Sequence, residues 1–177
     1  MPRLIDRNGV REDGWIVLAD DVQSPESGAD LLMPLALWRE SRERWLSHPG
    51  RIGVELGPAD DPAALAGDID RLTLITVAFP SFTDGRGYSI ARLLRERLNF
   101  RGELRAVGEI LRDQLFYLAR CGFDSFALRD DQDVGEALKA FADFSEVYQA
   151  AVDRGPLFAR RFAAAAVAAA PVERSGS

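Results

Sequence analysis

The sequence predicts an α/β protein with about five parallel strands joined by helical crossovers. Short apolar runs alternate about five times with stretches in which apolar residues recur at helical spacing. Hydrophobic residues make up 47% of the 177 residues, enough for a buried core. The chain is too short for a complete eightfold barrel, which takes about 250 residues. We therefore favour a doubly wound three-layer sandwich, with a partial or distorted β/α barrel as the alternative.

Turn residues and apolar runs justify the N-terminal elements. An Asn-Gly dipeptide within residues 4–11 is typical of a tight β-hairpin turn. The apolar run at residues 15–19 predicts a strand. A proline opens a predicted helix at residues 34–47, and residues 51–56 predict the next strand.

The middle of the chain contains the clearest succession of strand, loop and helix. Two aspartates before a proline predict the start of a short helix over residues 60–71. The β-branched run at residues 72–79 predicts a strand. A polar loop with two glycines follows at residues 80–87, and apolar residues at helical spacing then predict a helix that reaches residue 98.

Two further strand and helix pairs follow. Strands are expected at residues 103–108 and 125–128. Helices are expected at residues 110–121, where a glycine follows the last turn, and at residues 134–150, after a polar run.

We expect one α/β domain over residues 1–160, which includes the N-terminal hairpin. A last helix is expected to begin at Pro156. Residues 161–177 form an Ala-rich tail that we expect to be partly helical and then frayed.

Charge and cysteine content exclude several classes of protein. The formal charge of -6 argues against nucleic acid as a partner, because nucleic-acid binding needs basic surface. Cys121 is the single cysteine, so no disulfide scaffold is expected, and one cysteine cannot by itself hold an iron–sulfur cluster or a zinc ion. We expect no metal site. No signal peptide or membrane-spanning run is visible. We therefore expect a soluble, cytoplasmic protein with no membrane partner.

The polar loop after the 72–79 strand is the first candidate for a site. Ligands of parallel α/β sheets bind beyond the carboxyl ends of the strands. This loop and the helix start after it supply hydroxyl groups, glycine backbone and one acid–arginine pair, a combination that suits a small anion. The candidate residues are Ser81, Asp84, Arg86, Gly87 and Ser89. The loop lacks both the nucleotide P-loop pattern and the dinucleotide fingerprint.

A second polar cluster surrounds the next strand. Arg105 falls within an apolar strand, so its side chain must be paired, lie at an edge or face a site. We expect Asp84, Glu103 or Asp113 as its partner. Arg112 and Gln114 join Asp113 at the start of the following helix. An internal ion pair and a ligand-binding arginine look alike in sequence, and both interpretations stay open here.

Two long motifs, FPSFTDGRGYSIARLLRER and GELRAVGEILRDQ, resemble an uncharacterised bacterial family (domain of unknown function nine-three-four). The resemblance covers roughly residues 15–148. It carries the family pattern onto the following positions: Pro80, Asp84, Gly85, Arg86, Gly87, Ser89, Arg92, Arg95, Arg105, Gly108, Asp113, Gln114, Cys121, Gly122, Phe123 and Asp124.

The resemblance implies a role in assimilatory sulfur metabolism. Members are commonly encoded beside genes for sulfite reductase and phosphoadenylylsulfate reductase, and some carry the label of probable oxidoreductase. The resemblance implies no particular cofactor. Sulfite reductases need sirohaem and an iron–sulfur cluster, and a single cysteine cannot ligate such a cluster alone.

Two functions follow as expectations. The first is an accessory protein of assimilatory sulfate and sulfite reduction, which binds a partner reductase (sulfite reductase) or a small anion. The alternative is a small-molecule enzyme, such as an oxidoreductase, that acts on an anionic substrate. In the enzyme, Asp84 or Asp113 would be the catalytic acid–base group, and Arg86 and Arg105 would clamp the oxyanion. A nucleotide- or flavin-binding module is a third hypothesis.

Overall fold

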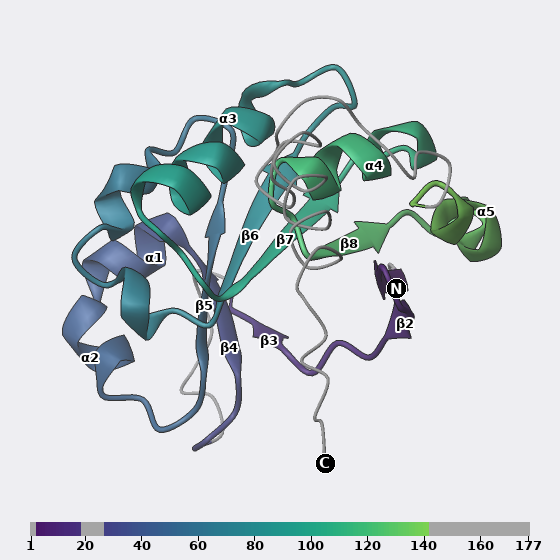
Figure 1. Ribbon diagram of the computed structural model, residues 1–177. Helices are drawn as coiled ribbons and strands as arrows, with labels where there is room; N and C mark the ends of the chain where they lie inside the picture. Colours follow the sequence, from purple (N-terminus) through teal and green to yellow (C-terminus); the bar gives the residue numbers. More distant parts are fainter. Residues whose placement is uncertain (1–2, 19–26, 142–177) are drawn as a thin grey trace, which may run out of the picture.

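The computed structural model describes residues 3–18 and 27–141 and contains one curled, eight-stranded sheet. Its strand order is β2-β1-β8-β7-β6-β5-β4-β3 (Figure 1). The strands are β1 (Arg3–Asp6), β2 (Gly9–Arg11), β3 (Ile16–Val17), β4 (Leu31–Pro34), β5 (Ile52–Leu56), β6 (Leu74–Phe79), β7 (Glu103–Gly108) and β8 (Ser125–Leu128). Strands β3 to β8 pair in parallel, while β1 pairs antiparallel with both β2 and β8.

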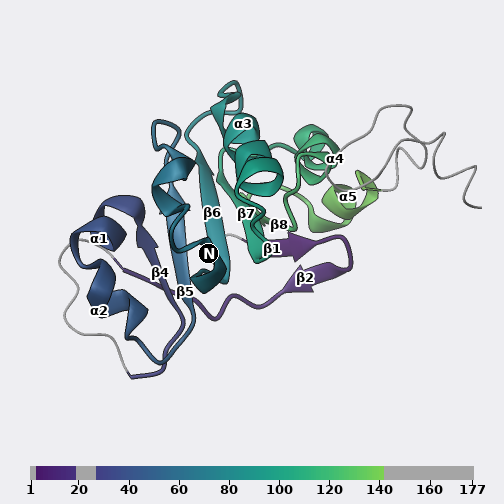
Figure 2. The same cartoon turned by 60° about the vertical axis from the view of Figure 1, so that its left-hand side comes forward.

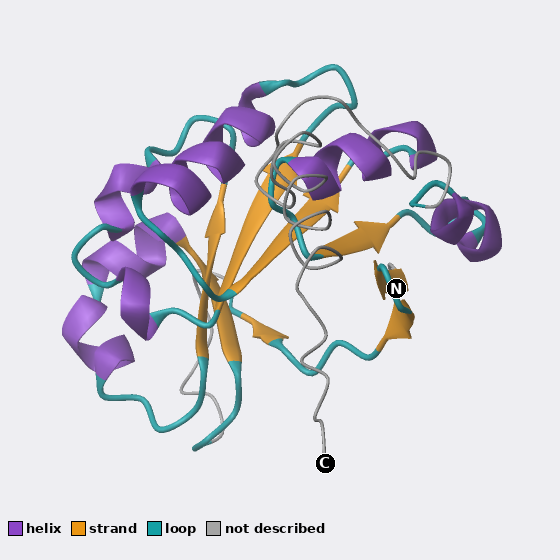
Figure 3. Cartoon of the chain, viewed as in Figure 1, coloured by secondary structure: helices purple, strands orange, loops and turns teal. Residues whose placement is uncertain are grey.

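The helices form an arc along the convex face of this sheet (Figure 3). They are α1 (Leu35–Glu40), α2 (Arg42–Leu46), the 3₁₀ turns η1 (Pro62–Leu65) and η2 (Ile69–Arg71), α3 (Arg86–Arg92), the π-helical turn η3 (Leu93–Arg97), α4 (Arg112–Arg120) and α5 (Val134–Lys139). Helix α1 packs on β4 and β5, α3 on β6, and α5 on β1.

The strand order decides between the two predicted architectures. The six parallel strands follow one another across the sheet in chain order, without a reversal. Because each crossover is right-handed, successive crossovers in the same direction place their helices on the same face. The structure is therefore the partial barrel given as the alternative, with more strands than predicted. The prediction of a doubly wound sandwich is wrong, because the second helical layer of such a fold requires the strand order to reverse.

The convex face of the sheet carries the hydrophobic core. Val54, Ile75 and Leu104 are register neighbours on β5, β6 and β7, and each is fully buried. Ile5 and Phe126 continue this face onto β1 and β8. Residues that are aligned across neighbouring strands point to the same face, so this face is apolar from the parallel strands to the hairpin.

The concave face carries a polar row instead. Glu55, Thr76, Arg105, Ser125 and Asp6 are aligned across β5, β6, β7, β8 and β1. Thr76 and Ser125 are fully buried and Arg105 is 3% exposed. A buried polar row of this kind must satisfy its hydrogen bonds within the fold.

The N-terminal third differs most from its sequence prediction. Strand β4 lies in a segment for which no strand was predicted, between the predicted strand at 15–19 and the predicted helix at 34–47. That helix is divided at Ser41 into α1 and α2. The hairpin pairs Asp6 with Gly9, so its turn residues are Arg7 and Asn8 rather than Asn8 and Gly9. Figure 2 shows this hairpin beside β8.

The later elements agree more closely with the sequence. The strands predicted at residues 103–108 and 125–128 are β7 and β8 with the same bounds. The segment at residues 60–71 forms two 3₁₀ turns rather than a helix. The end of the helix predicted at 134–150, the helix predicted from Pro156 and the tail at 161–177 lie outside the described residues.

Gly108, the last residue of β7, packs closely against the backbone of Phe79 at the end of β6, and this contact can be tested. Its φ is +98°, and a Cβ there would lie 2.4 Å from the Phe79 carbonyl oxygen. We expect Gly108→Ala to lower the free energy of unfolding by about 1–3 kcal/mol. Urea unfolding measures this loss. Gly67→Ala is the matched control, because a Cβ at Gly67 would meet no atom within 4 Å. Equal stability of the two variants would contradict the close approach at Gly108.

Candidate functional site

The polar loop lies at the carboxyl end of β6, between β6 and α3 (Figure 1). Two of its hydroxyl oxygens, Ser81 Oγ and Thr83 Oγ1, lie 3.0 Å apart. The Asp84 backbone N–H donates to the Ser81 carbonyl at 3.0 Å. The loop is thus closed by its own hydrogen bonds.

Asp84 and Arg86 form a two-pronged ion pair within this loop. Arg86 Nε donates to Asp84 Oδ1 at 3.0 Å, and Arg86 Nη2 donates to Asp84 Oδ2 at 2.6 Å. The Arg86 backbone N–H also donates to Asp84 Oδ1, at 3.1 Å. The side-chain hydrogen bond from Arg86 is the main cause that holds the pKa of Asp84 below its usual value. Asp84 is therefore ionised at neutral pH, and Arg86 already holds one carboxylate.

Gly87 and Ser89 lie on α3, directly after this loop. Gly87 is buried, and a Cβ there would lie 2.4 Å from the Phe79 ring. This close packing accounts for the glycine. Ser89 is exposed on the helix. The positions of these two residues neither require nor preclude a ligand, and their anion-binding role stays a prediction.

The second predicted cluster begins α4. Arg112 Nε donates to the Glu136 carbonyl at 2.9 Å, and Arg112 Nη1 lies 3.4 Å from Asp113 Oδ1. Gln114 Nε2 donates to the Phe82 carbonyl at 2.8 Å and to the Tyr88 hydroxyl at 3.1 Å. Gln114 therefore ties the start of α4 to both the polar loop and α3.

Arg105 lies on the concave face rather than at the carboxyl edge. Its Nη1 donates to Asp13 Oδ2 at 2.9 Å, and its Nε and Nη2 donate to Glu103 Oε1 at 3.2 and 3.1 Å. The same Glu103 oxygen accepts from Ser125 Oγ at 2.6 Å. Of the three partners predicted for Arg105, the structure has Glu103. It adds Asp13, which the sequence did not indicate.

The predicted site residues are thus divided among separate contacts. Asp84 pairs with Arg86 in the loop, and Gln114 joins α4 to that loop. Arg105 directs its hydrogen bonds to Glu103 and Asp13. The structure brings the two carboxyl-edge clusters together through Gln114, and places Arg105 in a different network.

An exposed apolar surface, which no sequence motif predicted, surrounds Gln114. Phe82, Leu111 and Tyr117 are 55%, 37% and 53% exposed. The Tyr117 ring lies 5.1 Å from the Tyr88 ring, centroid to centroid. We call Phe82, Tyr88, Leu111 and Tyr117 the aromatic patch. The available signal was the bulky Phe82 in an otherwise polar loop.

Comparison with known protein families identifies the family of this chain. A family described as a bacterial protein of unknown function (DUF934) matches residues 53–158. The chain belongs to the DUF934 family. This confirms the predicted resemblance, and the DUF934 match includes every predicted site residue. A search of curated proteins found no match.

Two further findings concern the described part of this DUF934 protein. None of its helices there combines the length and apolar character needed to cross a membrane. Within residues 3–18 and 27–141, no three His, Cys, Asp or Glu side chains are grouped so that they could hold a metal ion.

The different surroundings of Arg105 and Arg86 predict different effects of their removal. Arg105 is 3% exposed, and Arg105→Ala would leave Glu103 without its closest cation. We expect this variant to lose about 3 kcal/mol or more of unfolding free energy. Arg86 has a side chain 59% exposed, so Arg86→Ala should leave the urea midpoint close to that of the wild type. Equal losses in both variants would contradict this division.

Proposed function

We propose that this DUF934 protein is an accessory protein of assimilatory sulfite reduction that docks on a partner reductase through the aromatic patch. The sulfur context comes from the family resemblance of its central motifs. The observation that carries the docking role is the exposure of Phe82, Leu111 and Tyr117 around one fixed glutamine.

The composition of the patch supports a protein partner. Aromatic residues are enriched at protein–protein interfaces and supply many of the side chains that dominate binding energy. Tyr88 is the half-buried member of the patch, and its ring lies 5.4 Å from that of the buried Phe79, centroid to centroid. The patch therefore rests on the core of the protein.

The fixed geometry of the patch also supports docking. Gln114 accepts from the Leu111 backbone N–H at 3.0 Å and donates to the Phe82 carbonyl at 2.8 Å. Loop and helix are thus held in one arrangement before a partner arrives. Preorganisation of this kind lowers the entropy lost on binding.

The state of the two predicted catalytic aspartates favours binding over acid–base catalysis. Arg86 holds Asp84 ionised, which makes Asp84 a poor proton donor. The side chain of Asp113 is 88% exposed, whereas catalytic carboxyl groups are commonly shielded from water. A small anion at this edge would have to compete with Asp84 for Arg86. We therefore place the enzyme alternative second.

The docking proposal is tested by binding to sulfite reductase purified from the same organism. We expect Phe82→Ser combined with Tyr117→Ser to weaken the complex at least about tenfold, measured by isothermal titration calorimetry. The matched control is Val10→Ser, because Val10 is 64% exposed on β2, away from the patch. Circular dichroism confirms that each variant is folded. Failure of the wild type to bind the reductase, or equal weakening by the control, would overturn the proposal.

A further inference from the structure

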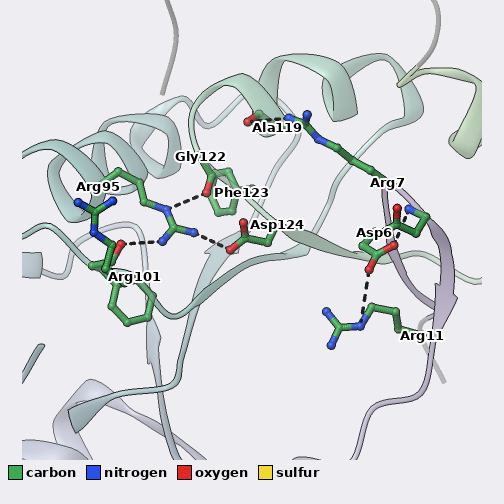
Figure 4. A pocket seen from close by; sticks show the side chains of 11 residues that line it. Asp6, Arg7, Arg11, Arg95, Arg101, Ala119, Gly122, Phe123 and Asp124 are labelled. Carbon is green, nitrogen blue, oxygen red and sulfur yellow. Dashed lines mark hydrogen bonds and ion pairs between the residues drawn. The ribbon is translucent and has the colours of Figure 1, made fainter. Parts of the chain in front are cut away.

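A pocket of about 580 Å³ lies at the amino ends of β7 and β8, opposite the end of the sheet that carries the polar loop. Figure 4 shows the side chains that line it. Its walls come from the β1–β2 turn, the end of α4, and the segments that precede β7 and β8. The lining residues are Asp6, Arg7, Asn8, Arg11, Arg95, Phe100, Arg101, Ala119, Gly122, Phe123 and Asp124. Its volume is typical of small-molecule sites, which commonly enclose about 300–1,000 Å³.

The pocket concentrates positive charge in an acidic chain. Four arginines line it against two aspartates, whereas the whole chain has a formal charge of -6. Arginine is the side chain best suited to phosphate and sulfate groups, because its planar fork offers several N–H donors.

Arg95 and Asp124 build the base of the pocket. Arg95 donates to the carbonyls of Phe100, Gly102 and Gly122 and to Asp124 Oδ2. The same Asp124 oxygen accepts from the Leu104 backbone N–H at 2.8 Å. The Arg95 side chain is only 11% exposed. Arg95 therefore has a structural role: its hydrogen bonds hold the segments that precede β7 and β8.

Asp6 is also engaged within the fold. Its Oδ1 accepts from the backbone N–H groups of Asn8 at 2.6 Å and of Gly9 at 3.1 Å. Both aspartates of the pocket therefore accept short hydrogen bonds from the backbone. Asp124 pairs with Arg95, and Asp6 reaches Arg11 only through a 3.8 Å ion pair, so these two aspartates neutralise the remaining arginines weakly.

Arg11 and Arg101 have donors to spare. Arg11 Nε lies 3.8 Å from Asp6 Oδ2, and Arg11 Nη1 lies 3.5 Å from Glu103 Oε2. The Arg11 side chain is 42% exposed. Arg7 is engaged within the fold, where one of its contacts is a hydrogen bond to the Ala119 carbonyl at 3.4 Å. Arg101 is exposed and makes no hydrogen bond or ion pair with another residue of the described part of the chain. The long contacts of Arg11 and the exposed Arg101 leave guanidinium N–H groups open to an incoming anion.

We propose that this pocket binds a small organic molecule through its phosphate or sulfate group, with Arg11 and Arg101 as the anion ligands. The oxyanion accepts charge-assisted hydrogen bonds from the guanidinium groups. The pocket volume exceeds what a single oxyanion fills, and Phe100 and Phe123 give the remaining space an apolar wall. The proposal stands apart from reductase docking, because none of its residues belongs to the aromatic patch.

The test compares ligands that share a ring and differ in their charged group. Phenyl phosphate, phenyl sulfate and benzoate are titrated into the full chain at constant ionic strength by isothermal titration calorimetry, with inorganic phosphate and sulfate in parallel. We expect phenyl phosphate or phenyl sulfate to bind at least about tenfold more tightly than benzoate and than its own inorganic ion. The tighter of the two identifies the natural group. Absence of saturable binding, or equal binding of all five anions, would overturn the proposal.

Matched variants assign the binding to this pocket. Arg101→Ala is expected to weaken the preferred ligand about tenfold without loss of stability, because Arg101 has no partner in the described part of the chain. Arg39→Ala removes the same charge from an exposed position on α1 and should leave affinity unchanged. Equal effects of both variants would show a non-specific charge effect and reject the pocket. Reductase binding by Arg101→Ala should remain intact, which separates this proposal from the docking surface.

Discussion

The ion pairs of Arg105 hold together the open side of the half-barrel. Because all crossovers run in one direction, the helices cover only the convex face of the sheet. The concave face has no helical layer in the described structure and carries charged groups at its centre. Burial of the Arg105 charge is costly unless partners compensate it, and Glu103 and Asp13 do so at hydrogen-bonding distance.

This network also positions the N-terminal segment over the concave face. Arg11 pairs with Glu103, and Asp13 pairs with Arg105. Trp15 lies close to Gly53, where a Cβ would come within 3.2 Å of the Trp15 ring. The segment from Arg11 to Trp15 therefore covers part of the sheet that the helices leave uncovered. This segment does not cover the two ends of the strands. The aromatic patch lies at the carboxyl ends, and the pocket lined by arginines lies at the amino ends.

Local features were predicted well, whereas features set by distant residues were not. The strands at 103–108 and 125–128 have the predicted bounds, because a short apolar run carries its own signal. Strand β4 was missed because Leu31 to Met33 stand next to Pro34, which suggested a helix start. The choice between sandwich and partial barrel depends on the side to which each new strand is added. Alternation of strands and helices along the chain does not contain that information.

The same distinction applies to the candidate sites. Glu103 was predicted as a partner of Arg105, since the two are neighbours on one strand face. Asp13 was not, because it lies 92 residues away in the chain. Arg95 and Asp124 belong to the family pattern, yet only the fold shows that they meet and form the base of a pocket. Arg7 and Arg11 join them from a hairpin that the DUF934 match does not cover.

The central claim is that Asp13, through Arg105, fastens the N-terminal segment to the sheet. Amide hydrogen exchange in Asp13→Ala tests it most directly. The Ile16 and Leu18 amides donate to the Asp30 and Leu32 carbonyls, both at 2.8 Å. Loss of the anchor should speed their exchange about fivefold, as expected for about 1 kcal/mol, while amides of central β6 keep their wild-type rates. Unchanged exchange at Ile16 and Leu18 would contradict the account.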